Sequence, residues 1–183
     1  MAKLKIPLSS RFSGLVGPKP TVLVTCRSPE GKVDIITVAA VTVASHEPPM
    51  FVISIKENRY SHNLIKAAGE FVINVPSIGL IEAVDLCGTL SGRDVDKFKE
   101  AHLTPEDGQV VSAPMIKECP INIECKVVAS VKPGTHTLFV GQVVAAHVEE
   151  GLFDGVKLNL EKLHTIVFNG SEYRRPGAVI RSR

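Results

Sequence analysis

The stretch Ile121–Val148 reads INIECKVVASVKPGTHTLFVGQVVAAHV and decides the fold class. Its two flanks, Ile121–Val131 and Thr137–Val148, are rich in the β-branched residues that favour strands. Between them, Lys132-Pro133-Gly134-Thr135 places Pro and Gly together, as a hairpin turn requires. The stretch therefore predicts two long antiparallel strands.

Shorter strands are expected on both sides of this hairpin, and the helices between them are short. Ser61 is expected to cap a helix that ends at Gly69. The other predicted helices are Leu80–Cys87 and Asp94–His102. The other predicted strands are Thr21–Arg27, Val33–Ser45 (a strand that runs into an extended loop), Met50–Ile55, Phe71–Val75 and Ile166–Phe168. A doubly wound parallel sheet needs helices of about 10–15 residues between successive strands, and the sequence lacks them. Six or seven mostly antiparallel strands predict a closed barrel.

Length and composition restrict the class of protein. The 183 residues suffice for one domain, with 44% hydrophobic and 22% charged residues. A net charge of +2 argues against a nucleic-acid partner, because its basic excess is confined to the tail residues Arg174, Arg175, Arg181 and Arg183. No apolar run reaches the roughly 20 residues of a membrane span, and the start MAKLKIPLSS lacks a signal-peptide core. A cytoplasmic protein with no membrane contact is expected.

The cysteines indicate neither a metal site nor a redox dithiol. Cys26, Cys87, Cys119 and Cys125 form no C-x-x-C pair, and each lies in or beside an apolar stretch. We expect them to be buried, reduced and without a metal.

Three segments are candidates for ligand binding. Arg59, Ser61 and Asn63 stand at the start of the helix expected after Ser61, where free N–H groups and the helix dipole favour an anion such as a phosphate monoester. A capped helix with solvated neighbours explains the same residues, and on this segment alone it is the favoured interpretation.

The second candidate is His136, which follows the hairpin turn and suits contact with a phosphate or an electron donor, although a surface histidine is the commoner finding there.

The third candidate segment is Thr37–Ser45 (TVAAVTVAS), in which small and hydroxyl residues alternate with β-branched ones. A planar ligand can lie against such a backbone and pair with its N–H and C=O groups. A buried strand has much the same composition. None of the three segments contains a nucleophile–base pair or a glycine-rich phosphate loop.

In their order and spacing, segments along the chain resemble the flavin reductase-like family, whose fold is an FMN-binding split barrel of Greek-key type. The resemblance spans about Pro18 to Tyr173 within a single domain of residues 1–183. The matching segments are Pro20–Thr25, Gly31–Thr37, Pro48-Pro49 before MFVISI, the Arg59/Ser61/Leu64/Ile65 cluster, Glu70–Val75, Asp96-Lys97-Phe98, Glu118-Cys119-Pro120 with Glu124-Cys125, Gly134-Thr135-His136 with Gly141-Gln142-Val143, and Tyr173.

The resemblance implies a homodimer that binds FMN near the subunit interface. It places Thr37, Val38, Ala39 and Ser45 along the flavin and Arg59, Ser61 and Asn63 on its phosphate. His136 matches a family position near the phosphates or the nicotinamide donor, and no catalytic residue is named.

Two positions depart from the family pattern. Asp34 stands where Asn is frequent, and a carboxylate there disfavours an anionic reduced flavin. Thr135 replaces the Asp before the histidine, which weakens the case for NAD(P)H handling at His136.

The expected function is electron transfer from NAD(P)H or a redox protein, through bound FMN, to a small-molecule or protein acceptor. The alternatives are a non-enzymatic FMN electron carrier, a ferric-chelate reductase and a flavin-free β-barrel interaction module.

Overall fold

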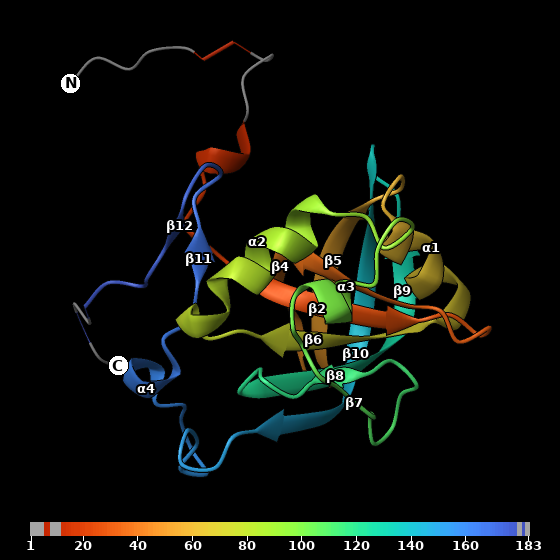
Figure 1. The fold of residues 1–183 in the computed structure, drawn as a ribbon. Coiled ribbons are helices and arrows are strands. Elements are labelled where there is room, and N and C mark those ends of the chain that lie inside the picture. The colour runs from red at the N-terminus through yellow and green to blue at the C-terminus, as the bar shows by residue number, and fades with distance from the viewer. Residues whose placement is uncertain (1–5, 8–11, 179–180, 182–183) are drawn as a thin grey trace.

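The computed structural model describes residues 6–7, 12–178 and 181 (Figure 1). Seven strands form one sheet in the order β3-β2-β6-β9-β10-β5-β4, and each neighbouring pair is antiparallel. The sheet coils around a hydrophobic interior. Its strands are β2 (Val22–Arg27), β3 (Val33–Val38), β4 (Val41–His46), β5 (Pro49–Lys56), β6 (Glu70–Val75), β9 (Ile121–Val131) and β10 (His136–Val148).

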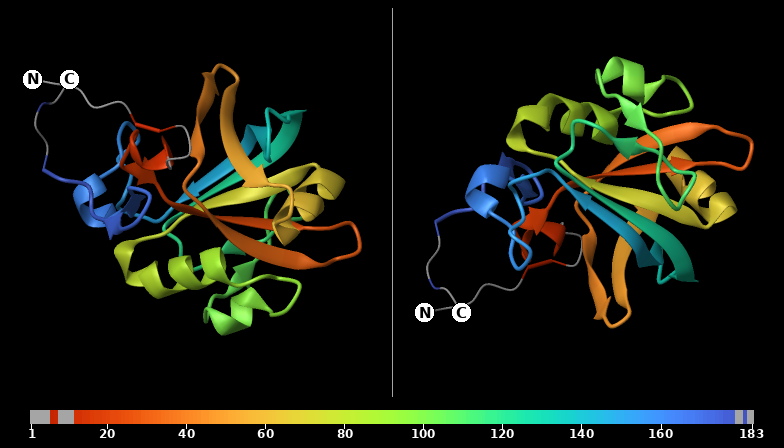
Figure 2. Two further views of the ribbon diagram at one scale, coloured as in Figure 1. Left: turned by 90° about the horizontal axis from the view of Figure 1, so that it is seen from above. Right: turned by 90° about the horizontal axis from the view of Figure 1, so that it is seen from below.

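The two edges of this sheet approach each other and give a split barrel. Edge strands β3 and β4 are consecutive in the chain, and the Ser54 N–H of β5 donates to the Ala40 carbonyl between them at 2.9 Å. The β4–β5 hairpin projects from the barrel body (Figure 2). The expected mostly-β split barrel is therefore confirmed.

The decisive hairpin forms as its sequence predicts. Strand β9 has the predicted bounds, and β10 begins one residue earlier than expected, at His136. Gly141 of β10 lies against Phe71, because a Cβ at this glycine would stand 2.5 Å from the Phe71 Cζ. The glycine thus allows a bulky aromatic ring to fill the barrel interior.

The sequence predicts that Val33–Ser45 is a strand that runs into an extended loop; the strand is confirmed as β3, but the predicted loop is wrong, because a second strand, β4, forms there. β3 pairs with β2 and β4 pairs with β5, so the chain crosses between them at Ala39-Ala40. Two successive alanines suit such a crossing, because neither has a large side chain that would need a place in the core. The crossing creates the concave surface described below.

The helices lie outside the barrel and differ from expectation at their starts. α1 (Tyr60–Ala68) ends at Gly69, as predicted, with a left-handed φ of 70°. Its N-cap is Arg59 and no side chain caps it, so the predicted Ser61 cap is wrong. Instead of Asp94–His102, α3 is only Lys97–Glu100, because the Asp96 side chain accepts the Phe98 and Lys99 N–H groups and starts the helix there. α2 (Ile81–Thr89) follows the short 3-10 turn Ile78–Leu80.

Hydrophobic side chains fill both sides of strands β2 and β3. Val24, Ile53, Phe71 and Phe139 belong to the cluster inside the barrel. On the other side, α2 and α3 add Val84, Cys87 and Phe98 to a second cluster that contains Leu23 and Ile35. All four cysteines are buried and free, as expected.

Small elements complete the structure. β1 (Lys19–Pro20), β11 (Val167–Phe168) and β12 (Tyr173–Arg174) bring both ends of the described chain into one three-stranded sheet. β7 (Pro105–Glu106) pairs with β8 (Met115–Ile116), and the remaining helical segments are α4 (Leu160–Leu163) and the 3-10 turn Phe12–Gly14.

Within the described ranges, no helix is long and apolar enough to span a membrane. Most of the MAKLKIPLSS segment and Arg183 of the basic tail lie outside the described residues.

Candidate functional site

The chain crossing from β3 to β4 forms one wall of a pocket of about 290 Å³. The start of α1, the end of β5 and the first residue of β10 supply the other walls, and β1 and β11 approach from the chain ends. The lining residues are Lys19, Ile36, Thr37, Val38, Ala39, Ala40, Ser54, Ile55, Lys56, Arg59, His136, Phe168 and Gly170.

Basic side chains surround this pocket, and none of the described residues that line it carries a carboxylate. Lys19, Lys56, Arg59 and His136 come from four separate segments of the chain. The nearby Glu57 is held by Lys132, whose Nζ lies 2.7 Å from the carboxylate and whose hydrogen bond lowers the pKa of Glu57. The pocket therefore favours an anionic group.

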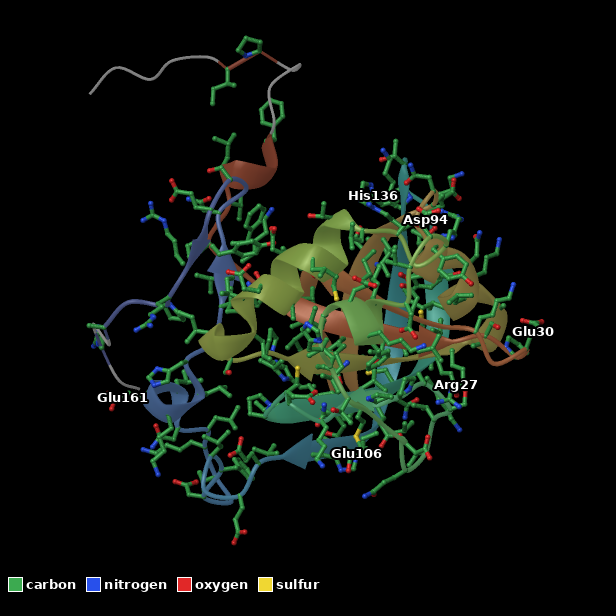
Figure 3. The ribbon with its side chains drawn as sticks, viewed as in Figure 1. Arg27, Glu30, Asp94, Glu106, His136 and Glu161 are labelled. Carbon is green, nitrogen blue, oxygen red and sulfur yellow. The ribbon has the colours of Figure 1, made fainter. Side chains whose placement is uncertain are left out.

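His136 and Arg59 are both exposed and available to a ligand. In Figure 3, His136 lies at the upper end of the barrel, whereas Glu106 lies toward its lower end. Its Nδ1 is 2.9 Å from the Thr135 hydroxyl, and this contact orients the ring. Arg59 has extended backbone (φ −74°, ψ 142°) directly before the first turn of α1. The helix dipole adds to the positive potential at this point.

The opposite wall of the pocket is largely apolar. Ile36, Val38 and Ala39 lie at the end of edge strand β3, where alternate backbone N–H and C=O groups point away from β2. The Thr37 hydroxyl donates to the Val84 carbonyl of α2, which fixes β3 against that helix. A planar heteroaromatic group fits such a surface, with backbone groups free to pair with its edge.

A buried polar cluster lies behind the Arg59 side of the pocket. The Asp34 carboxylate accepts a hydrogen bond from the Ser61 hydroxyl and lies 3.4 Å from the Lys97 Nζ. Lys97 also donates to the carbonyls of Ile35 (2.6 Å) and Cys87 (3.1 Å). The charges of Asp34 and Lys97 offset each other, so the carboxylate at position 34 does not present a net negative charge to the pocket.

This cluster borders a second cavity of about 150 Å³, which shares Ile36 and Arg59 with the first. Cys87 lines it, and burial raises the pKa of that thiol to about 11. A thiol with so high a pKa stays protonated and is a poor nucleophile.

The structure brings five of the eight predicted site residues together. Thr37, Val38, Ala39, Arg59 and His136 line the first pocket. Ser61 is fully buried and its hydroxyl is directed to Asp34, whereas Asn63 is exposed on α1 and contacts the His62 Nδ1 at 3.2 Å. Ser45 lies near the tip of the β4–β5 hairpin and does not line the pocket.

Sequence reasoning missed Lys19, Phe168 and Gly170 as lining residues. They reach the pocket only because β1 pairs with β11, a contact between residues some 150 positions apart. No local motif marks such a pairing, because each strand has just two residues. The site combines an apolar wall with a basic rim, and its lining contains no nucleophile–base pair.

The flavin reductase like domain model matches residues 16–176 of the chain. Among curated proteins, the reductase component of an FADH2-dependent resorcinol hydroxylase from a Rhizobium species is 30% identical over 132 residues, which are 71% of this chain and 70% of that protein.

Two solved structures show the same likeness in three dimensions. Flavoredoxin from Methanosarcina acetivorans superimposes with a TM-score of 0.89 and 28% identity, over 100% of this chain and 95% of that one. An FMN-binding protein from Thermus thermophilus gives a TM-score of 0.82 and 27% identity, over 100% and 99% of the two chains.

Proposed function

The chain belongs to the flavin reductase-like family, and from this premise we propose that it binds FMN and passes electrons through it from a reduced donor to an acceptor. The likeness to an FMN-binding protein and a flavoredoxin supports FMN as the cofactor. The likeness to the reductase component of an FADH2-dependent hydroxylase supports an enzymatic role as a reductase, and we propose NADH or NADPH as its donor.

The pocket between the β3 end and the α1 start carries this proposal. Its basic rim, with no carboxylate among the described lining residues, suits a phosphate, and its apolar wall suits an isoalloxazine ring. FMN supplies the hydride and electron chemistry when bound, and the protein supplies binding, orientation and electrostatics.

We assign the phosphate to Arg59, Lys56 and His136 at the basic rim. Ser61 and Asn63 have a smaller part in this assignment than the sequence predicted, because the Ser61 hydroxyl is used by Asp34 and Asn63 is turned toward His62. The ring lies along Thr37, Val38 and Ala39. The backbone groups of edge strand β3 position it, and no protein acid or base is required for hydride transfer to a flavin.

A second subunit completes the site in this proposal. The pocket volume of about 290 Å³ is at the lower limit for a cofactor site, so one subunit covers only part of FMN. A cross-strand row of Thr42, Val52, Val140 and Ala129 crosses four neighbouring strands on the outer face, and Val131 is 57% exposed beside it. We propose that this face pairs with a second copy, and sedimentation of the flavin-loaded protein tests it. A monomer at micromolar concentration would contradict this pairing.

The function is tested by titrating the purified protein with FMN and recording its absorbance before and after anaerobic addition of NADH or NADPH. Binding with rapid bleaching of the flavin supports a reductase, and ferric chelates can then be offered as acceptors. Binding with slow bleaching supports a non-enzymatic electron carrier such as a flavoredoxin. No FMN binding at tens of micromolar would overturn the proposal and leave a flavin-free module.

The site assignment is tested with Arg59→Ala. Loss of one charge-assisted hydrogen bond of about 1.5–3 kcal/mol should weaken FMN binding roughly tenfold or more. Lys66→Ala is the matched control, because Lys66 is an exposed cation in the last turn of the same helix and does not line the pocket. Equal dissociation constants for wild type and Arg59→Ala, with both proteins folded by circular dichroism, would refute the assignment.

A further inference from the structure

The second cavity brings another arginine toward the Arg59 side of the site. It is lined by Arg59 and by Arg93, which belongs to the turn Ser91–Asp94 between α2 and α3. Arg59 and Ile36 are the residues common to the two cavities, so Arg59 stands between them. Arg93 therefore shares a cavity with Arg59, and that cavity adjoins the pocket lined by Lys56 and His136.

Contacts within the chain hold Arg93 in this position. Its Nη1 donates to the Asn58 carbonyl at 3.1 Å, and its guanidinium carbon lies 5.4 Å from the centre of the Tyr60 ring. A guanidinium has five N–H donors, and the Asn58 contact uses only one of them. The side chain is exposed, so its other donors remain available to a ligand.

Gly92 fixes where this turn lies. A Cβ at Gly92 would stand 2.2 Å from the Asp34 Oδ1 and 2.9 Å from the Tyr60 Cδ1, so only glycine permits the close approach. The Ser91 carbonyl accepts the Asp94 N–H at 3.0 Å and closes the turn. Arg93 is thereby tethered to the same polar cluster that anchors the start of α1.

The charges at this end of the site do not cancel. Lys97 is offset by Asp34 at 3.4 Å. Among the described residues, neither Arg59 nor Arg93 forms an ion pair with a carboxylate. A phosphate monoester carries about −1.5 to −2 charges at pH 7, which two guanidinium groups can balance.

Building on the proposed function, we propose that Arg93 is a second arginine of the FMN phosphate site and makes the protein selective for FMN over riboflavin. In this proposal the phosphate lies where the two cavities meet at Arg59, so that Arg59 and Arg93 both contact it. Riboflavin has the same ring and ribityl chain but no phosphate, so it gains nothing from Arg93.

The experiment compares the affinities of FMN and riboflavin by fluorescence titration for wild type, Arg93→Gln and Arg93→Lys. Arg93→Gln should raise the FMN dissociation constant about tenfold and change that of riboflavin less than about twofold. Arg93→Lys keeps the charge without the planar fork and should fall between wild type and Arg93→Gln. Lys117→Gln is the control, because it removes an exposed cation that lines neither cavity.

Equal weakening of FMN and riboflavin by Arg93→Gln would overturn the inference, because it would show that Arg93 only supports the fold near Tyr60. An FMN dissociation constant that is the same in Arg93→Gln as in wild type would also overturn the inference, but not the proposed function. A wild-type protein that does not bind FMN would overturn the proposed function and this inference together.

Discussion

Replacing Lys97 by Met tests whether the buried Asp34–Lys97 pair stabilises the fold. Both side chains are almost fully buried, with exposed fractions of 1% for Asp34 and 4% for Lys97. Met retains most of the volume of the lysine stem and removes the ammonium. The Asp34 carboxylate then keeps the hydrogen bond from the Ser61 hydroxyl but loses its ion-pair partner, and the Ile35 and Cys87 carbonyls lose the hydrogen bonds that Lys97 donates.

The expected cost follows from leaving a charge buried without its partner, which is about 3–5 kcal/mol. In a protein of this size a loss of 1 kcal/mol lowers the melting temperature by about 2–4 °C, so a drop of roughly 6–20 °C is expected. The Asp34→Asn/Lys97→Met double variant removes both charges and should be more stable than Lys97→Met alone. With Asp34→Asn measured alone, the two single variants, the double variant and the wild type form a cycle that gives the coupling energy of the pair.

Urea unfolding followed by circular dichroism gives the free energies, provided that the transition is two-state. Lys132→Met is the matched control, because Lys132 pairs with Glu57 at the surface, with exposed fractions of 57% and 44%. That variant should lose no more than about 1 kcal/mol. A loss below about 1 kcal/mol for Lys97→Met, or a double variant as unstable as the sum of the single ones, would refute the reasoning.

Two further predictions concern other parts of the barrel. Burial alone raises the pKa of Glu124, but hydrogen bonds from His147 and from the backbone N–H groups of Val110, Val111 and Gln109 outweigh it and bring the pKa below the ordinary 4.5. The stability that Glu124 contributes is therefore present above about pH 4.5 and is lost as the pH falls through the lowered pKa. Glu124→Gln should lower the free energy of unfolding by about 1.5–3 kcal/mol at pH 7, and urea unfolding from pH 7 to pH 3 should show that this difference from wild type shrinks in acid. A difference that stays constant would contradict this. Gly141→Ala should lower the free energy of unfolding by about 1–3 kcal/mol, because the new Cβ would stand 2.5 Å from the Phe71 Cζ. Gly134→Ala is the control and should be nearly neutral, because a Cβ there has nothing within 4 Å. Equal melting temperatures for the two variants would count against the close packing of Gly141 on Phe71.

The parts of the fold that could be predicted from the sequence are those where local signals agree with tertiary structure. β9 and β10 combine β-branched residues with a Pro-Gly turn, and Gly69 ends α1 in the left-handed conformation that glycine favours. The crossing at Ala39-Ala40 could not be predicted in this way. Its residues continue the apolar pattern of β3, and only the pairing of β4 with β5 shows that the strand has changed partner.

The residues of the candidate site likewise fall into those that the sequence predicts and those that it does not. Arg59 and His136 stand beside recognisable local features, a helix start and a hairpin turn, so sequence reasoning finds them. Lys19 and Phe168 become neighbours of the site through the pairing of β1 with β11. Ser61 was assigned to the phosphate because a serine near a helix start is a common donor, but a buried carboxylate distant in the sequence takes its hydroxyl. Long-range partners of this kind have no local signature.

The Asp34–Lys97 pair alters the expected effect of the carboxylate at position 34, where the family frequently has Asn. An isolated carboxylate at position 34 would oppose an anionic reduced flavin by charge repulsion. Lys97 lies 3.4 Å away, is equally buried and donates to two backbone carbonyls, so the pair adds little net charge. The potential at the proposed flavin is then set by the basic rim of Lys19, Lys56, Arg59 and His136. If flavin binds as proposed, Lys97 thus offsets the charge of the Asp34 carboxylate, which alone would oppose an anionic reduced flavin.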